Sequence, residues 1–380
     1  MKVLHLASFS GNIGDVANHE SFYKCFKDLF IEDLAIEKIE IRDFYYSINK
    51  RRFDEEFVEY LNTFDLFIFG GGNFFELCWD YSDTGTTFNI SNNLLRKIKV
   101  PILINGIGID DFKGTTNENI EKFRSFLNTL LNYSNVLFTV RNDGSYEIFK
   151  KYYPEYVEKI AEIPDFGFFV SDVYEMKSYK PILKNKSIGI NIAKDMEEFR
   201  YTNVSYEEFL RGMAQLIEYI LNTTNYHVML FPHILSDYEV ILNVNEYVNH
   251  PDKRIRLSIS GLVQEKELET FKLYKECDFI FATRFHSNIC AISLNIPTFG
   301  IITYPKHGIV YEKIKLSNRK QNLNSNQIFD QMKQQVDLCN DHYHMKQIKK
   351  SYNDSILELI KVRDSYLEKL KNWMENYIGK

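Results

Sequence analysis

The chain has 380 residues, which is enough for two domains with separate hydrophobic cores. Its content of 44% hydrophobic and 26% charged residues is typical of a globular protein in water. The net charge of −6 gives no general attraction to nucleic acid, and no basic recognition motif occurs, so we exclude a nucleic-acid partner. The five cysteines form no CxxC pair and indicate neither a disulfide framework nor a zinc site.

The apolar segment at residues 3–7 is shorter than a secretory signal and is predicted to be a buried strand. No segment approaches the roughly 20 consecutive apolar residues that a membrane span requires. We therefore expect a cytoplasmic protein. Its alternative location is peripheral, at the inner face of the cytoplasmic membrane.

In the first half of the chain, short apolar runs alternate with amphipathic segments. The predicted strands are residues 3–7, 36–41, 66–69, 102–105 and 136–140. The predicted helices include residues 17–30, 117–131 and 145–153. This alternation predicts βαβ units and a parallel sheet.

The second half repeats the pattern. Its predicted strands are residues 188–192, 227–231, 255–258, 279–282 and 298–302. Its predicted helices include residues 206–221, 238–248, 263–275 and 288–294. Two such series predict an α/β fold of two doubly wound, Rossmann-like domains. We place these at residues 1–175 and 185–325, with a boundary near residues 171–186.

Residues 326–380 lack strands and carry apolar residues at helical spacing, which predicts a long C-terminal helix. The predicted stripe comprises Ile356, Leu359, Ile360, Leu367, Leu370, Trp373, Met374 and Tyr377. We expect this stripe to pack on the domains. Contact of its lysine-bearing face with an anionic membrane surface is the alternative.

Glycines and small polar residues follow the predicted strands of the first half. They occur as GNIGD at 11–15, GGGN at 70–73, GIG at 106–108 and RNDGS at 141–145. Ligands of parallel sheets bind at the carboxyl ends of the strands, and glycines allow a ligand to approach the backbone closely. The alternatives are plain turns and helix caps, which we favour for Asp143 and Ser145. The candidate binding residues here are Asn12, Gly14, Gly71, Gly72, Asn73 and Arg141, and Asp15 is a candidate catalytic residue.

The second half has three polar segments at its predicted strand ends. TRFHS at 283–287 follows an apolar run and opens a helix, so backbone N–H groups, Arg284 and Ser287 can bind a phosphorylated anion. His286 can move a proton near neutral pH. Tyr304 and Lys306 follow the next strand. His233 follows another, with Asp237 close to it, and is a second acid/base candidate. The spacing of Cys, His, Asp and Glu matches no metal site.

Taken in order, these segments resemble the polysaccharide pyruvyltransferase family over residues 1–310. The resemblance implies a glycosyltransferase-B-like fold, with two Rossmann-like domains facing a cleft. It also implies transfer of pyruvate from phosphoenolpyruvate to a sugar, usually as a cyclic ketal, in capsule, exopolysaccharide or cell-wall polymer synthesis. Arg284 and His286 match the family's Arg-x-His element, which contacts phosphoenolpyruvate. Lys306 matches a lysine that follows the tyrosine on the next strand.

Two segments depart from the family pattern: Asp165 is followed by phenylalanine rather than proline, and Asn142 separates Arg141 from Asp143. The implied donor substrate is phosphoenolpyruvate, with no cofactor. The implied acceptor is a sugar or a lipid-linked oligosaccharide containing galactose, mannose or N-acetylhexosamine. In the implied reaction His286 or His233 is the acid, and Asp15 or Asp143 orients the acceptor.

Two other functions remain open from the sequence. A sugar-nucleotide glycosyltransferase of the same architecture would need a carboxylate for the ribose, and Glu265, Glu267 and Glu269 lie near the required region. A non-catalytic glycan-binding protein would not need the charged residues at 284–306. The acceptor sugar, the stereochemistry of the ketal and the oligomeric state are not determined by the sequence.

Overall fold

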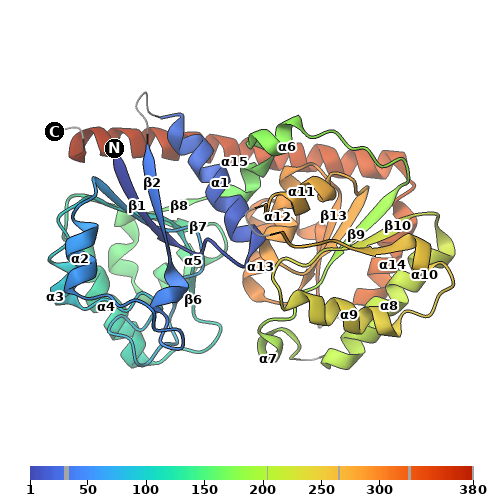
Figure 1. The fold of residues 1–380 in the computed structure, drawn as a ribbon, viewed down its shortest axis with the longest axis horizontal. Coiled ribbons are helices and arrows are strands. Elements are labelled where there is room, and N and C mark those ends of the chain that lie inside the picture. Colours follow the sequence, from blue (N-terminus) through green and yellow to red (C-terminus); the bar gives the residue numbers. More distant parts are fainter. Residues whose placement is uncertain (30–33, 203, 264–265, 324–326, 379–380) are drawn as a thin grey trace. The chain divides into compact units, whose positions relative to one another are not determined.

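The computed structural model of the chain describes residues 1–29, 34–202, 204–263, 266–323 and 327–378. The chain divides into two compact units, each with one six-stranded parallel sheet flanked by helices (Figure 1). Unit 1 comprises Met1–Ser10, Phe22–Asp165 and Ile360–Lys380. Unit 2 comprises Gly11–Ser21 and Phe166–Leu359.

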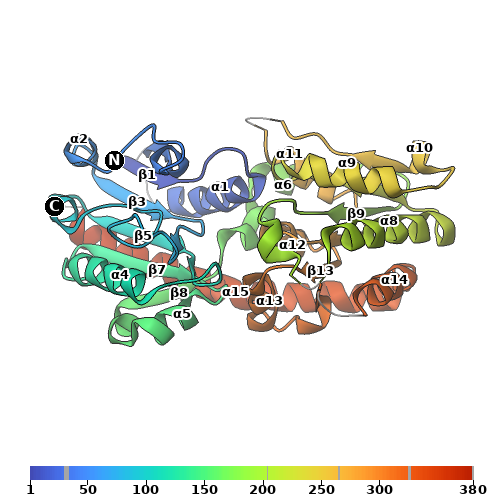
Figure 2. The ribbon, with the colours of Figure 1, turned by 90° about the horizontal axis from the view of Figure 1, so that it is seen from below.

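The sheet of unit 1 has the strand order β2-β1-β3-β5-β7-β8. Figure 2 shows β1, β3, β5 and β7 side by side in this order. The strands are β1 (Lys2–Ala7), β2 (Ala35–Glu40), β3 (Leu66–Gly70), β5 (Ile102–Ile107), β7 (Val136–Arg141) and β8 (Ile160–Ile163). Two short strands, β4 (Phe75–Glu76) and β6 (Ile109–Asp110), pair separately. Every residue of β3 and β5 is buried, as expected where helices cover both faces of a parallel sheet.

The helices of unit 1 begin at residues that satisfy free backbone N–H groups. Asp54 accepts from the Phe57 amide before α2, and Thr116 accepts from the Asn119 amide before α4. The helical segments are η1 (Ile41–Phe44), α2 (Glu55–Leu61), α3 (Asn92–Leu95), α4 (Asn117–Leu130), α5 (Ser145–Tyr152) and η2 (Pro154–Lys159). They pack a phenylalanine-rich core against the sheet.

The sheet of unit 2 has the order β11-β10-β9-β12-β13-β14. The strands are β9 (Ser187–Asn191), β10 (His227–Leu230), β11 (Leu257–Ile259), β12 (Phe279–Ala282), β13 (Thr298–Ile302) and β14 (Lys320–Asn322). Chain order runs outward in both directions from the β9–β12 pair, so the strand order reverses there. This reversal is the point at which open α/β sheets bind ligands.

The helical segments of unit 2 are η3 (Phe166–Asp172), α6 (Tyr174–Ser178), α7 (Glu197–Arg200), α8 (Tyr206–Thr223), α9 (Asp237–Tyr247), α10 (Lys253–Arg256), α11 (Glu269–Tyr274), α12 (Phe285–Ser293), α13 (Pro305–Lys313), η4 (Ser317–Arg319) and α14 (Ile328–Leu338). α8 begins with a capping box, in which Ser205 and Glu208 each accept from the other's backbone N–H group. Its apolar face then packs on the sheet through residues such as Phe209, Met213 and Ile217.

Two helices contribute residues to both units: α1 (Ile13–Lys27) and α15 (His342–Tyr377), the long red helix in Figure 1. In unit 1, α15 buries Tyr366, Leu370, Trp373 and Met374. In unit 2 it buries Ile348 and Tyr352. Tyr377, which was predicted to belong to the apolar stripe, is 39% exposed.

The fold class predicted from sequence, two Rossmann-like domains with a long C-terminal helix, is confirmed. The strand predicted at residues 255–258 is wrong at its start, because α10 extends to Arg256 and β11 begins at Leu257. The Arg256 side chain pairs with Asp252 one helical turn earlier and donates to the Leu221 carbonyl, which favours the helical turn. β8 and β14 were not predicted as strands.

Each unit is built from separate segments of the chain, whereas the predicted domains were continuous. The chain passes from unit 1 to unit 2 at Asp165–Phe166, shortly before the predicted segment at 171–186. The start of α1 belongs to unit 2, and the second half of α15 belongs to unit 1.

Candidate active site

The polar segment after β12 forms the start of α12 in unit 2. Arg284 is the residue before the helix, and His286 and Ser287 lie in its first turn, earlier than the helix predicted at 288–294. The last residue of β9 fixes this turn: the Asn191 side-chain oxygen accepts from the Arg284 amide at 3.1 Å, and its backbone carbonyl accepts from the Thr283 hydroxyl at 3.2 Å. The N-terminus of α12 is thereby held where the strand order reverses.

The Arg284 side chain is buried and is held by two carboxylates. Its Nε donates to Asp237 Oδ2 at 2.7 Å, and its Nη2 contacts Asp237 Oδ1 and, at 2.5 Å, Asp195 Oδ1. Burial alone would lower the pKa of Arg284, but the two carboxylates raise it above its ordinary value. Arg284 is therefore charged at every working pH and fixed in orientation. Among the described residues, none accepts a hydrogen bond from its Nη1.

Arg200, at the end of α7, is a second buried arginine at this edge, and the sequence analysis did not identify it. Its Nε donates to the Asp195 carbonyl and its Nη1 to the Thr303 hydroxyl, both at 2.8 Å. Burial would raise the pKa of Asp195, but Arg284 and Arg200 hold it below its ordinary value. Because residues 192–200 follow the carboxyl end of β9, the strand-end argument applied to the other segments could have found both residues.

His286 is packed against the glycine of the predicted GNIGD segment. A methyl group added to Gly14 would lie 2.4 Å from His286 Cβ, closer than carbon atoms can approach, so only glycine fits. His286 Nδ1 lies 3.8 Å from Asp15 Oδ1, close enough to form an ion pair when the ring is protonated. Asn12 accepts from the Gly14 amide at 3.0 Å and so shapes the start of α1. The structure thus brings two segments that are 270 residues apart into one site.

His233, which follows β10, is fully buried and is linked by hydrogen bonds to the start of α12. Its Nε2 is hydrogen-bonded to the Tyr274 hydroxyl at 2.6 Å, and that hydroxyl is hydrogen-bonded to Ser287 Oγ at 2.7 Å. Burial lowers the pKa of His233 well below its ordinary value, and the charge of Arg284 lowers it further. His233 is therefore neutral at pH 7. Its backbone carbonyl accepts from the Ile13 amide at 3.2 Å.

The end of β13 continues into α13, and Pro305 occupies the first helical position. Tyr304 and Lys306 are buried, as is His307, whose Nδ1 donates to the Thr283 carbonyl at 3.0 Å. The His307 ring lies 5.9 Å from Phe285 and 5.8 Å from Tyr304, centroid to centroid. His307 therefore connects the two segments that carry His286 and Lys306.

Unit 1 also has a buried arginine at the carboxyl edge of its sheet. Arg141 donates to Asp143 Oδ2 through Nε at 3.0 Å and Nη2 at 2.8 Å, and its Nη1 lies 3.4 Å from Asp165 Oδ2. Asp143 also accepts from the amide and hydroxyl of Ser145, the first residue of α5. The role of Asp143 at the start of the helix is the alternative that we favoured from the sequence.

The glycine run after β3 packs on the end of β5. The Gly71 amide donates to the Asn105 carbonyl at 2.7 Å, and the Gly72 carbonyl accepts from the Gly108 amide at 2.8 Å. Gly70 has a φ of 143° and lies against the Asn105 carbonyl, where a side chain would clash. This packing directs Asn73 toward Asp110, to which its side chain donates at 3.1 Å.

A model of the family described as "Polysaccharide pyruvyl transferase" matches residues 12–304, the larger part of the chain. The chain belongs to the polysaccharide pyruvyl transferase family. The match includes the segments that carry Asp15, His233, Arg284 and His286, and it ends two residues before Lys306. The family is one of transferases that act in polysaccharide synthesis. No curated protein matches the sequence.

Solved structures with a similar fold include a glycosyltransferase, a UDP-GlcNAc 2-epimerase and a protein solved with UDP. A glycosyltransferase from Rickettsia africae has a TM-score of 0.57 at 12% identity, covering 100% of this chain and 98% of that one. The MnaA protein of S. aureus, solved with UDP, has a TM-score of 0.55 at 11% identity and 97% coverage of both chains. The UDP-GlcNAc 2-epimerase of Methanocaldococcus jannaschii has a TM-score of 0.54 at 11% identity, covering 90% and 92%. At these identities the likeness establishes the fold.

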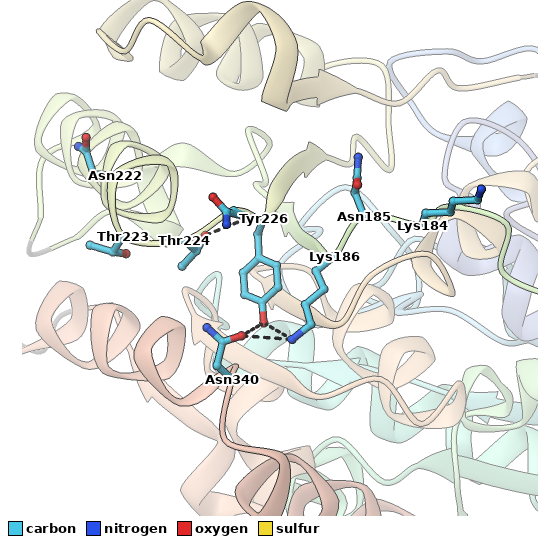
Figure 3. Close-up of a pocket in the computed structure, with 9 residues that line it drawn as sticks. Lys184, Asn185, Lys186, Asn222, Thr223, Thr224, Tyr226 and Asn340 are labelled. Carbon is cyan, nitrogen blue, oxygen red and sulfur yellow. Dashed lines mark hydrogen bonds between the residues drawn. The ribbon is translucent and has the colours of Figure 1, made fainter.

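Unit 2 also contains a polar cavity of about 500 Å³, which does not lie at these strand ends. Figure 3 shows the residues that line it. It is lined by residues that precede β9 and β10, including Lys186 and Tyr226, together with Asn340. The Tyr226 hydroxyl donates to Asn340 at 2.8 Å, and Lys186 Nζ donates to the same oxygen at 3.2 Å. This cavity is at the amino edge of the sheet, opposite the edge at which parallel sheets bind substrates. The candidate site described above lies at the opposite, carboxyl edge.

The described residues contain neither a cluster of potential metal ligands nor a helix suited to cross a membrane. No group of three His, Cys, Asp or Glu residues has the arrangement of a metal site there. No helix among those residues combines the length and apolar character that a membrane crossing needs. Of the glutamates considered for a ribose subsite, Glu265 lies outside the described residues, and Glu269 pairs with Lys272 at 2.5 Å.

Proposed function

We propose that this protein transfers pyruvate from phosphoenolpyruvate to a sugar residue and forms a cyclic ketal, in the synthesis of a capsule, exopolysaccharide or cell-wall polymer. The observation that carries this proposal is the N-terminus of α12 at the strand-order reversal of unit 2. There a carboxylate-held arginine and a glycine-packed histidine follow the same buried strand. Membership of the polysaccharide pyruvyl transferase family supports the reaction class.

Phosphoenolpyruvate carries a phosphate and a carboxylate, and it therefore needs two binding groups of positive potential. Arg284 Nη1 and the backbone N–H groups at the start of α12 suit one of them. Arg200 and Lys306, at the ends of neighbouring strands, suit the other. Asp237 and Asp195 lower the cost of burying these charges before the donor binds. We expect Ser287 and Tyr304 to add hydroxyl contacts.

We assign His286 as the general acid. In the first step it gives a proton to the methylene carbon of phosphoenolpyruvate, and a sugar hydroxyl forms a bond to the adjacent carbon. The bond from that carbon to phosphate then breaks, and a second hydroxyl closes the ketal ring. One hydroxyl proton re-protonates His286, the second leaves with phosphate, and no redox partner is required. Asp15, whose Oδ1 lies 3.8 Å from His286 Nδ1, is proposed to keep the ring oriented toward the donor.

His233 is the weaker candidate for the acid. Its burial and low pKa leave it neutral at pH 7, without a second proton to donate. Its bonds to Tyr274, and through Tyr274 to Ser287, suit a positioning residue that fixes the first turn of α12. In unit 1, Gly71, Gly72, Asn73 and Arg141 are proposed to shape the acceptor side, where Asn73 and Asp110 offer amide and carboxylate groups to sugar hydroxyls. A lipid-linked acceptor would bring the protein to the inner membrane face.

The test is calorimetric titration of the purified protein with phosphoenolpyruvate and, separately, with uridine diphosphate. We expect only phosphoenolpyruvate to bind. In His286→Gln we expect binding to persist while turnover, measured as phosphate release with an acceptor present, falls by about 100-fold or more. His342→Gln, at an exposed histidine of α15, is the matched control and should behave as the unmodified protein. Binding of uridine diphosphate alone would instead assign the chain to the sugar-nucleotide glycosyltransferases.

A further inference from the structure

Three aromatic side chains from two loops of unit 1 lie together at its surface. Tyr46 and Tyr81 are 76% and 43% exposed, and their ring centroids lie 5.2 Å apart at an interplanar angle of 39°. Trp79, half-buried, lies 5.8 Å from the Tyr81 ring. We call Tyr46, Trp79 and Tyr81 the aromatic platform. Two adjacent exposed tyrosines from separate loops are not explained by packing, since neither fills a core.

The aromatic platform lies at the substrate-binding edge of the unit 1 sheet. Tyr46 follows the carboxyl end of β2 by way of η1, and Trp79 and Tyr81 follow the carboxyl end of β3. Both strands pair in parallel with β1, so their carboxyl ends point to the same edge. The loop after β3 also carries Asn73. The platform and the proposed acceptor residues are therefore parts of one loop system.

Backbone hydrogen bonds hold the platform in place before any ligand arrives. The Trp79 amide donates to the Gly85 carbonyl at 3.2 Å, and the Trp79 carbonyl accepts from the Ser82 amide at 3.0 Å. On the other loop, the Asn49 amide donates to the Tyr45 carbonyl at 2.7 Å. The Tyr45 ring lies beneath, with its centroid 6.4 Å from that of Trp79. A preordered surface of this kind binds with a smaller entropic cost than a loose loop does.

The chemistry of the platform suits a sugar ring. One face of a pyranose presents C–H groups, which are attracted to the negative face of an aromatic ring, while the hydroxyl groups at its edge stay hydrated. The phenol groups can bond to those hydroxyls, and the exposed carboxylates of Asp80 and Asp83 flank Tyr81 in the sequence. Tyrosine and tryptophan also lose little conformational entropy on binding. A purely apolar partner would leave these polar groups desolvated without partners.

We propose that the aromatic platform is a subsite for a sugar residue of the acceptor chain that neighbours the residue being modified. This inference rests on the proposed function for the identity of the ligand. It adds where a second sugar residue of the acceptor binds and which acceptors are preferred. An acceptor of two or more sugar residues then occupies both the reacting position and the platform. The protein should accordingly prefer an oligosaccharide to a single sugar.

The platform can be tested without phosphoenolpyruvate. The measurement is saturation-transfer NMR with lactose, mannobiose and N,N′-diacetylchitobiose as probes, followed by titration of those that bind. We expect at least one disaccharide to bind, and Tyr46→Ala and Tyr81→Ala to weaken that binding about five- to tenfold. Tyr46→Phe should retain most of the affinity, because it keeps the ring. Tyr343→Ala removes an equally exposed tyrosine, 73% exposed, from α15 and should leave binding unchanged.

Two results would overturn the inference: none of the three disaccharides binds, or the Tyr46 and Tyr81 variants bind as tightly as Tyr343→Ala. The outcome is independent of the donor. Disaccharide binding that depends on the platform, together with failure to bind phosphoenolpyruvate, would retain the platform and reject the proposed donor. Turnover of phosphoenolpyruvate that is unaffected in both tyrosine variants, for single sugars and oligosaccharides alike, would retain the proposed function and reject the platform.

Discussion

Each unit has a buried arginine, paired with two carboxylates, at the carboxyl edge of its sheet. The residues around this arginine differ between the units. In unit 1, Arg141 is buried between Asp143 and Asp165. In unit 2, Arg284 is buried between Asp237 and Asp195. In each unit two carboxylates contact one buried arginine and fix its orientation, and in unit 2 Asp195 also lies 3.6 Å from Arg200 Nη2.

The surroundings of the two arginines differ in charge. Beside Arg141 lie Asn73 and the Gly70–Gly72 run, so the edge of unit 1 offers mainly amide and backbone groups. Unit 2 adds Arg200 and Lys306 at neighbouring strand ends. Under the proposed function, the edge of unit 1 binds a hydroxyl-bearing acceptor and the edge of unit 2 an anionic donor, and the two edges differ in the residues that follow the strands.

The largest expected effect comes from removing one carboxylate of each pair. Asp237→Asn and Asp143→Asn should each lower the free energy of unfolding by about 3–5 kcal/mol, because a buried guanidinium loses its principal partner. The measurement is urea denaturation of both variants. If the units differ as proposed, Asp237→Asn should also weaken phosphoenolpyruvate binding by about tenfold or more, because Arg284 is reoriented.

Asp143→Asn provides the comparison for that result, because it disturbs a buried arginine of unit 1 to a similar extent. Its affinity for phosphoenolpyruvate should stay within about twofold of the unmodified protein. Equal weakening in both variants would show that donor binding is not a property of unit 2 alone. Asp237→Glu, which keeps the charge, separates loss of charge from loss of shape.

A second comparison uses the two glycines that touch candidate site residues. In Gly14→Ala the added methyl group would lie 2.4 Å from His286 Cβ, and the ring must move. We expect turnover to fall by about 100-fold, because displacement of a catalytic group by about 1 Å has that effect. In Gly108→Ala the methyl group would instead lie 2.5 Å from Asn73 Oδ1, and we expect the KM for the acceptor to rise.

The control for both glycine variants is Gly261→Ala, where an added methyl group meets no atom of the described residues within 4 Å. Steady-state kinetics with each substrate varied in turn separates the effects. Normal turnover in Gly14→Ala would remove His286 from the proposed mechanism, because the ring cannot keep its place there. An unchanged acceptor KM in Gly108→Ala would remove Asn73 from the acceptor side.

The smallest expected effect is a pH dependence of stability that arises from His233. Its pKa is lowered in the folded protein, first by burial and then by Arg284, so the unfolded chain binds the proton more readily. Stability is therefore complete above about pH 6.5, the ordinary histidine value, and decreases as the pH falls below it. The slope attributable to this residue is at most about 1.4 kcal/mol per pH unit.

Urea denaturation at several values between pH 5 and pH 8 measures this slope. In His233→Gln, which cannot take up the proton, the dependence below pH 6.5 should be weaker. His342→Gln should retain the dependence of the unmodified protein. A His233→Gln profile parallel to that of the unmodified protein would contradict the assignment. Asp195 contributes to stability in a different pH range. Because its pKa is lowered in the folded protein, its contribution is lost only below about pH 4.

Much of the fold could be predicted from the sequence because apolar strands that are buried on both faces form short, strongly apolar runs. β3, β5, β9, β12 and β13 are of this kind, and each was predicted within a few residues. β14 could not be found in this way, because its sequence KQN is polar and becomes a strand only by pairing with β13. The start of α12 was placed too late because polar residues such as His286 and Ser287 usually signal a loop.

The sequence by itself determined the two parallel-sheet units, the family and the residues that follow the strand ends, because local periodicity and motif order record these features. The tertiary structure alone decided which charges meet: that Asp195 and Asp237 hold Arg284, that Arg200 joins them, and that Gly14 packs against His286. Asp237 and Asp195 are separated from Arg284 by 47 and 89 residues, and Gly14 is separated from His286 by 272 residues. No local pattern encodes such pairs, because they depend on the order of strands in the sheet and on packing between elements that are distant in sequence.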